Sequence, residues 1–159
     1  MRAEEVIKRY DEIKKELRLL DFQLSNFKGI SENDIIDTMT YSHAEGDKVK
    51  TSGTSDKTFN IAIKCKSIME RKNDEWYEFL WQRKISLTEE IDFFEQSIEI
   101  IEHSDIAKAM FIQKMTWTEI ESLFSISHSS VGKYRKQIVK ELEEIYDARD
   151  RQLESYLLS

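Results

Sequence analysis

The chain opens with a regular alternation of apolar and charged positions. Apolar side chains recur at alternating intervals of four and three residues through the first 27 positions. This spacing keeps one apolar stripe on one side of a helix, where it packs against another helix. The stripe consists of Val6, Tyr10, Ile13, Leu17, Leu20, Leu24 and Phe27. Because a single helix of this length is not stable alone, we expect a packing or oligomerisation seam.

A second helical pattern runs from about Lys57 to Glu102. Its C-terminal half repeats the same intervals at Leu80, Leu87, Ile91, Phe94, Ile98 and Ile101, with Lys84 in a seam position. An antiparallel hairpin within one chain and a coiled coil between two copies both satisfy the two seams. An aromatic-rich cluster is predicted to fill the core or a dimer interface, and it consists of Trp76, Tyr77, Phe79, Leu80 and Trp81.

Residues 29–56 separate the two helical patterns. Glycine, serine, threonine, asparagine and aspartate dominate this segment, which predicts a linker with a short helical turn at Asn33 to Thr38. Its run GDKVKTSGTSD lacks the GxxxxGK[ST] spacing of a phosphate-binding loop. A linker is therefore favoured over a nucleotide-binding loop.

The last third predicts three helices. A short one spans Ser104 to Gln113 with Ser104 as its cap, and the chain turns at Lys114 and Met115. Thr116 and Glu119 have the spacing of a capping box for the next helix, and Ser127 caps the third. The expected apolar faces are Trp117, Ile120, Leu123 and Phe124 on the second helix, and Val131, Ile138, Leu142 and Ile145 on the third.

These patterns predict an all-α protein. Residues 1–102 form a long helical hairpin or coiled coil, and residues 103–159 form a helix-turn-helix domain with a C-terminal extension of its last helix. The absence of an apolar run long enough for a bilayer, and of a signal peptide, favours a cytoplasmic protein without a membrane partner.

Positive charge is concentrated in the predicted helix-turn-helix. The whole chain has a formal net charge of -7, yet the segment from Lys108 to Lys140 has six basic and two acidic residues. Residues 141–159 reverse this balance, with six acidic and two basic residues. Since phosphate binding needs local positive potential, double-stranded DNA is the expected partner of the third helix.

Individual contacts follow from the layout of a recognition helix. His128, Ser129 and Lys133 are predicted to reach base edges, whereas Arg135, Lys136 and Lys140 are predicted to meet phosphates. Ser130 and Tyr134 belong to the same predicted surface. Gly132 costs about 0.8–1 kcal/mol inside a helix relative to alanine. Close approach to DNA or to the preceding helix would explain this glycine, and so would tolerance of a surface position.

No catalytic constellation is apparent. His43, His103 and His128 are far apart and have no helical partner at metal-ligand spacing, and the lone Cys65 lies in no nucleophile motif. We therefore expect no enzyme activity, no metal and no cofactor.

The run MTWTEIESLFSISHSSVGKYRKQIVKEL, which ends at Leu142, resembles the helix-turn-helix of bacterial sigma factor region 4. With the N-terminal helical pair and linker, the chain resembles small Gram-positive phage and prophage transcriptional regulators of the ArpU kind. Ser125 stands where the sigma pattern has its turn glycine. The resemblance implies regulation of transcription, with RNA polymerase as a candidate partner. The residues on matching positions are Glu119, Ile120, Ser127 and Val131 as scaffold and Lys133 as a DNA contact.

Two other functions fit the same patterns. A phage DNA-packaging recognition subunit of the small-terminase kind also combines a helix-turn-helix with oligomerising helices. A coiled-coil adaptor would leave the basic surface solvated. A homodimer is expected, because one small helix-turn-helix with about four cations binds DNA weakly and two half-sites compensate for this.

Overall fold

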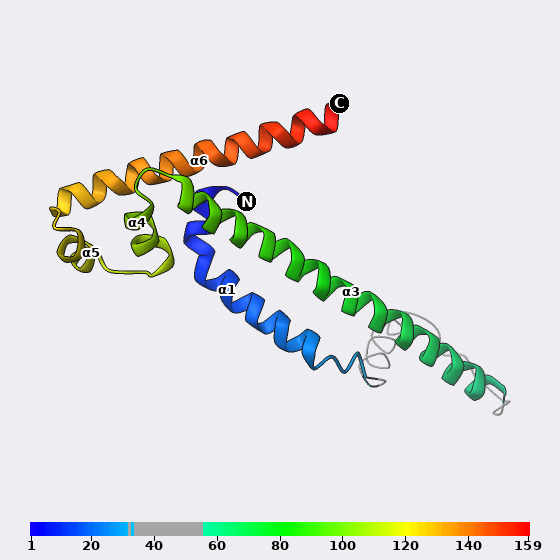
Figure 1. Ribbon diagram of the computed structural model, residues 1–159. Coiled ribbons are helices and arrows are strands. Elements are labelled where there is room, and N and C mark those ends of the chain that lie inside the picture. The colour runs from blue at the N-terminus through cyan, green and yellow to red at the C-terminus, as the bar shows by residue number, and fades with distance from the viewer. Residues whose placement is uncertain (32, 34–55) are drawn as a thin grey trace, which may run out of the picture. The chain divides into compact units, whose positions relative to one another are not determined.

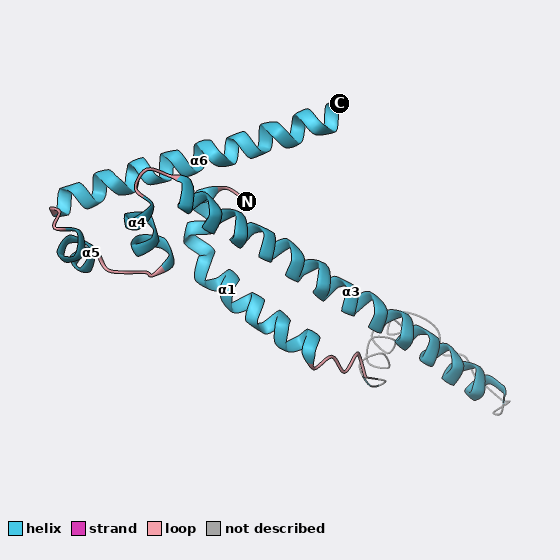
Figure 2. Ribbon diagram, viewed as in Figure 1, coloured by secondary structure: helices cyan, strands magenta, loops and turns pink. Residues whose placement is uncertain are grey.

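The computed structural model describes residues 1–31, 33 and 56–159, and every regular element in these residues is a helix (Figures 1 and 2). The predicted all-α class is confirmed. The elements are α1 (Ala3–Ser25), α3 (Asp56–Ile100), α4 (Ser104–Ala107), the π-helical turn η1 (Lys108–Ile112), α5 (Trp117–Phe124) and α6 (His128–Leu158). Nearly all of the predicted linker, with its turn at 33–38 and its GDKVKTSGTSD run, lies outside the described residues. None of the described helices is long and apolar enough to cross a bilayer.

The chain forms two compact units, one from Met1–Arg18 with Ile85–Ser159 and the other from Leu19–Lys84. We call them the terminal unit and the middle unit. Both α1 and α3 contribute residues to each unit. The predicted division into a helical region, residues 1–102, and a helix-turn-helix domain, residues 103–159, stays a prediction.

In the middle unit, the end of α1 runs antiparallel to α3. Asp21 Oδ1 lies 2.6 Å from Lys84 Nζ, and the rings of Phe27 and Tyr77 pack edge to face with centroids 5.1 Å apart. The seam residue Leu20 is buried, while Leu24 and Phe27 are half-buried. Lys84 in the second seam is thus explained, because its ammonium group is paired with Asp21.

Most of the buried apolar side chains belong to the terminal unit. Tyr10 of α1 packs against Phe94 of α3 with ring centroids 5.8 Å apart, and Phe93 packs edge to face on Tyr146 of α6 at 4.9 Å. Of the seam residues in this unit, Leu17 is half-buried and the others are buried, namely Val6, Tyr10, Ile13, Leu87, Ile91, Phe94, Ile98 and Ile101. Packing of α1, α3 and α6 around these residues fixes the position of α6.

Charged side chains fasten α6 to the start of α1 within the terminal unit. Arg2 pairs with Glu143 at 2.8 Å and with Asp147 at 2.7 Å. The hydrogen bond to Asp147 raises the pKa of the Arg2 guanidinium, so this group stays charged. Arg149 lies 4.4 Å from the centroid of the Phe93 ring. The ion pairs of the half-exposed Arg2 specify which helices meet more than they add to stability.

The helix starts follow the predicted caps in two of three cases. Glu119 N–H donates to Thr116 Oγ1 at 3.3 Å and Thr116 N–H donates to Glu119 Oε2 at 2.8 Å, which confirms the capping box. Ser127 Oγ accepts from Ser130 N–H at 3.3 Å, so the cap of α6 is also confirmed. The cap predicted at Ser104 is wrong, because Ser104 is already helical and His103 precedes it without a side-chain cap bond.

The predicted short helix is not a single α-helix. After α4 the backbone widens into η1, where Gln113 N–H donates to Lys108 C=O at 2.9 Å across five residues. Ile106, Ala109 and Met110 are buried, and Ile112 is half-buried. The predicted turn follows, with Lys114 at a φ of 54°.

The aromatic cluster on α3 is not in the core. Leu80 is buried, whereas Trp76, Tyr77, Phe79 and Trp81 are all exposed. The prediction that these four fill the core is therefore wrong, although one edge of the exposed Tyr77 ring packs on Phe27. The alternative, that the cluster lies in a dimer interface, stays a prediction.

Candidate nucleic-acid interface

Three residues connect α5 to α6 in the terminal unit. Ser125 has φ 53° and ψ 47°, a left-handed conformation that ends α5, and Ser127 is extended and caps α6. Ile126 N–H donates to Glu121 C=O at 3.2 Å. The chain thus reverses within a short connection, so that α5 lies beside the first turns of α6 (Figure 1).

One side of α6 is packed. Its buried residues are Val131, Ile138, Leu142 and Tyr146. Of the predicted packing residues, Ile145 is only half-buried, and Tyr146 takes the buried position instead. On α5 only Ile120 is buried; Phe124 is half-buried, while Trp117 is 40% and Leu123 60% exposed. The predicted apolar face of α5 is therefore wrong for Leu123, and Trp117 is exposed as well, although its ring lies against His128.

The opposite side of α6 has a row of polar and basic residues. Ser129, Lys133, Lys136 and Lys140 follow one another at intervals of four, three and four residues, so they share one side of the helix. We call these four residues the basic stripe. All four are exposed. Lys140 lies 3.8 Å from Glu144, whereas Lys133 and Lys136 have no ion pair within the described residues.

His128 begins α6 but is held from the side of α5. Its Nδ1 lies 3.1 Å from Glu121 Oε1, and its ring centroid is 5.0 Å from that of Trp117. The ring is nevertheless 74% exposed. His128 is thus oriented by two α5 side chains while one edge of its ring stays accessible to a ligand.

The other predicted contact residues lie outside the basic stripe. Arg135 is half-buried and lies four residues after Val131 and three before Ile138, in line with the packed side. Tyr134 packs edge to face on His103 with centroids 4.6 Å apart. Ser130 Oγ lies 2.9 Å from Ser127 Oγ at the helix cap. The predicted phosphate contact of Arg135 has less support from this geometry than those of Lys136 and Lys140.

Gly132 faces the ring of Trp117. A Cβ added at this position would lie 3.7 Å from the nearest ring carbon, an ordinary van der Waals distance. The close approach to the preceding helix that was one explanation of this glycine is therefore present, but an alanine would fit the same space.

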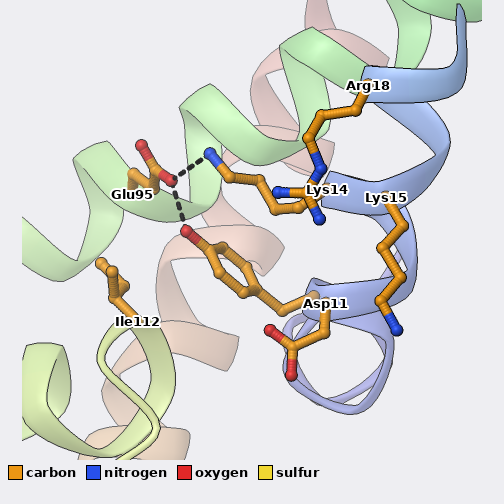
Figure 3. A pocket seen from close by; sticks show the side chains of 7 residues that line it. Asp11, Lys14, Lys15, Arg18, Glu95 and Ile112 are labelled. Atoms are coloured by element: carbon orange, nitrogen blue, oxygen red, sulfur yellow. Dashed lines mark hydrogen bonds and ion pairs between the residues drawn. The ribbon is translucent and has the colours of Figure 1, made fainter.

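A second polar site in the terminal unit is a cleft of about 500 Å³ beside α1 (Figure 3). Glu95 accepts hydrogen bonds from Tyr10 Oη at 2.6 Å and from Lys14 Nζ at 3.4 Å. Burial, and then the bond to Glu95, raise the pKa of Tyr10. Lys15 and Arg18 also line the cleft. Its hydrogen-bonded side chains connect α1 to α3, so we interpret the cleft as structural.

Sequence reasoning missed the contacts that orient His128. Glu121 and Trp117 lie seven and eleven residues before it, across the α5–α6 connection. Neither interval is a helical spacing once the helix is interrupted, so no pattern in the sequence marks the pair. Among the described residues, no group of three or more histidine, cysteine, aspartate or glutamate side chains could hold a metal ion.

Comparisons of the chain with protein-family models, with curated proteins and with solved structures found no match.

Proposed function

We propose that this protein is a sequence-specific double-stranded-DNA-binding transcriptional regulator. In this proposal α6 enters the major groove with its first turns, and Ser129 and Lys133 approach base edges. Lys136 and Lys140 lie farther along the same side and neutralise phosphates. The protein is not an enzyme, needs no cofactor and acts in the cytoplasm as a homodimer, with RNA polymerase as a candidate further partner.

The observation that supports the proposal best is the basic stripe. Its residues are exposed on the side of α6 that is opposite the packed residues, directly after a capped helix and a three-residue connection. Two of its lysines have no ion pair within the described residues, so phosphates would not have to compete for them. The resemblance to sigma factor region 4 and to regulators of the ArpU kind agrees with this use.

The test is DNA binding across a salt series. The purified protein is titrated with duplex from upstream of its own coding sequence and with a scrambled duplex. The stripe variant is Lys133→Ala/Lys136→Ala/Lys140→Ala, and the matched control is Lys8→Ala/Lys64→Ala/Lys66→Ala, which removes three exposed lysines elsewhere. Each lost phosphate contact lowers the slope of log affinity against log salt by about 0.9.

We expect the wild type and the control variant to prefer the upstream duplex. The stripe variant should lose about 2 units of salt slope, because two of its three lysines are assigned to phosphates. If none of the three proteins binds either duplex at low salt, the adaptor function replaces the regulator. Equal loss of slope in both variants would show that the cations act through total charge and not through the basic stripe.

A DNA-packaging recognition subunit is the second candidate. It shares the combination of a helical pair and a basic recognition helix, and it would also bind DNA in this assay. The regulator is favoured because the DNA-binding part follows the helical pair along the chain, whereas packaging subunits typically place it first.

A further inference from the structure

The middle unit exposes large apolar side chains on one side. Trp76 is 41% and Phe79 57% exposed, and their rings stack with centroids 5.6 Å apart and planes 15° from parallel. Phe22 of α1 is 64% exposed and lines one groove together with Trp76. Contiguous apolar surface of this kind typically marks a site of protein association.

Phe79 is at the centre of a row along α3. Residues three, four and seven positions before it, and three and four positions after it, lie on the same side of the helix. We call this set the Phe79 face, and it consists of Lys72, Glu75, Trp76, Phe79, Gln82 and Arg83. Its aromatic centre is therefore flanked by charged and amide side chains in both directions.

The charges of the Phe79 face are arranged so that the face of one copy is complementary to the same face of a second copy. Glu75 lies four residues before Phe79 and Arg83 four residues after it, on opposite edges of the row. A two-fold axis through Phe79, perpendicular to α3, places Glu75 of one copy opposite Arg83 of the other. It places Trp76 opposite Gln82 and Phe79 opposite its own copy. A two-fold interface requires this reciprocity.

We propose that two copies of this chain associate through the Phe79 face, with their α3 helices antiparallel. The two Glu75–Arg83 contacts set the register, and Phe79 and Trp76 supply the buried apolar centre. In its own chain Glu75 Oε2 lies 3.1 Å from Lys72 Nζ and Oε1 lies 3.8 Å from Arg71 Nε, and Arg83 also has an interaction there, so the contacts across the axis would be shared with these exposed partners. A carboxylate with two oxygens and a guanidinium with five N–H groups can each accept a further partner. The proposal does not depend on DNA binding.

The first test is sedimentation of the full chain over a wide concentration range without DNA. We expect a monomer–dimer equilibrium in which Phe79→Ala raises the dissociation constant about tenfold or more. Since Phe79 is 57% exposed, its truncation leaves the fold of the monomer intact, which circular dichroism checks. A wild-type chain that stays monomeric at every concentration overturns the proposal.

The second test exchanges charges across the axis. Glu75→Arg alone opposes two guanidinium groups at both ends of the interface, and Arg83→Glu alone opposes two carboxylates. Each should raise the dissociation constant about tenfold, because two symmetric contacts change from attraction to repulsion. When the two variants are mixed, every cross-chain contact joins a guanidinium to a carboxylate, so a mixed dimer should form with about wild-type affinity.

Glu70→Arg is the matched control, because Glu70 is exposed nine residues before Phe79 and lies on the opposite side of α3. It should dimerise as the wild type does. Mixing that fails to restore the dimer, or single variants that dimerise normally, overturns the antiparallel register. DNA binding is measured separately, so failure of this interface and failure of the regulator proposal are distinguishable.

Discussion

Substitution of Gly132 tests whether the glycine lowers stability and whether the space beside it is needed. The added Cβ of Gly132→Ala would meet Trp117 at 3.7 Å, which is contact without overlap. We therefore expect the free energy of unfolding to rise by about 0.8–1 kcal/mol, the helix propensity difference. Urea denaturation measures this change.

The same variant reports on DNA approach. Gly132 lies one residue before Lys133 of the basic stripe. If the glycine is there for close approach to DNA, Gly132→Ala will bind the upstream duplex more weakly although it is more stable. A loss of stability would contradict the fit that Trp117 allows.

At the scale of residues, the sequence predicted interactions within one helical turn correctly. It did not predict contacts between side chains of different helices. Thr116 and Glu119 form their capping box because both partners lie within one turn, which the sequence displays directly. His128 and Glu121 meet only because the chain reverses between α5 and α6. The exposure of Leu123 likewise depends on which neighbours the fold brings to α5.

At the scale of elements, the connection between α5 and α6 includes a residue whose backbone conformation lowers the stability of the fold. Ser125 has a φ of 53°, a region that costs a residue with a Cβ about 1–2 kcal/mol. Ser125→Gly should relieve this cost and raise the free energy of unfolding by about 1 kcal/mol, because glycine is the preferred residue after a helix end. Thermal and urea denaturation are the measurements. An unchanged stability would mean that the serine side chain compensates for its backbone.

The type of each element and most helix starts could be predicted from the sequence. Which side of a helix other elements bury could not always be predicted. The seam of α3 is buried at Leu80, Leu87 and Ile91 as its intervals predict. Trp76 and Phe79 lie outside that seam, so periodicity could not place them in the core. The π-helical turn after α4 was not predicted, because the residues that it buries, Ala109, Met110 and Phe111, would fit an α-helix equally well.

For the whole molecule, burial of Tyr146 makes the free energy of unfolding depend on pH. Burial, and then the negative charge of Glu90, raise the pKa of Tyr146, and its hydroxyl has no hydrogen-bond partner within the described residues. An unfolded chain ionises its tyrosines above about pH 10, whereas the folded chain keeps Tyr146 neutral. Stability is therefore fully present below that pH and falls as the pH rises through the folded pKa.

Tyr146→Phe should be as stable as the wild type at about pH 7, or about 1 kcal/mol more stable, since it removes an unpaired buried hydroxyl. Its free energy of unfolding should also fall less steeply above about pH 10. Denaturation at the two pH values tests this, with the exposed Tyr156→Phe as control. A loss of more than about 1 kcal/mol at neutral pH would mean that the hydroxyl stabilises the fold.

The division of the chain into two units could not be predicted. Both α1 and α3 continue through the boundary, and the seam of α1 shows no interruption at Arg18. The seam of α3 has Lys84 beside the boundary, but a single polar seam position does not predict a division into two units. The boundary therefore depends on where α4 to α6 add their packing, which is a property of three-dimensional neighbours and not of spacing along the sequence.

The length of α6 decides how a protein of net charge -7 could meet a polyanion. Its 31 residues extend about 46 Å at 1.5 Å per residue. At physiological ionic strength, electrostatic fields decay over about 8 Å. Asp150 and Glu154 lie about 25–30 Å along the helix from Lys133 and are screened from it, whereas Glu144 lies 3.8 Å from Lys140. In the proposed function, the first turns of α6 would therefore present positive potential to a duplex, while the most negative part of the helix stays at its far end.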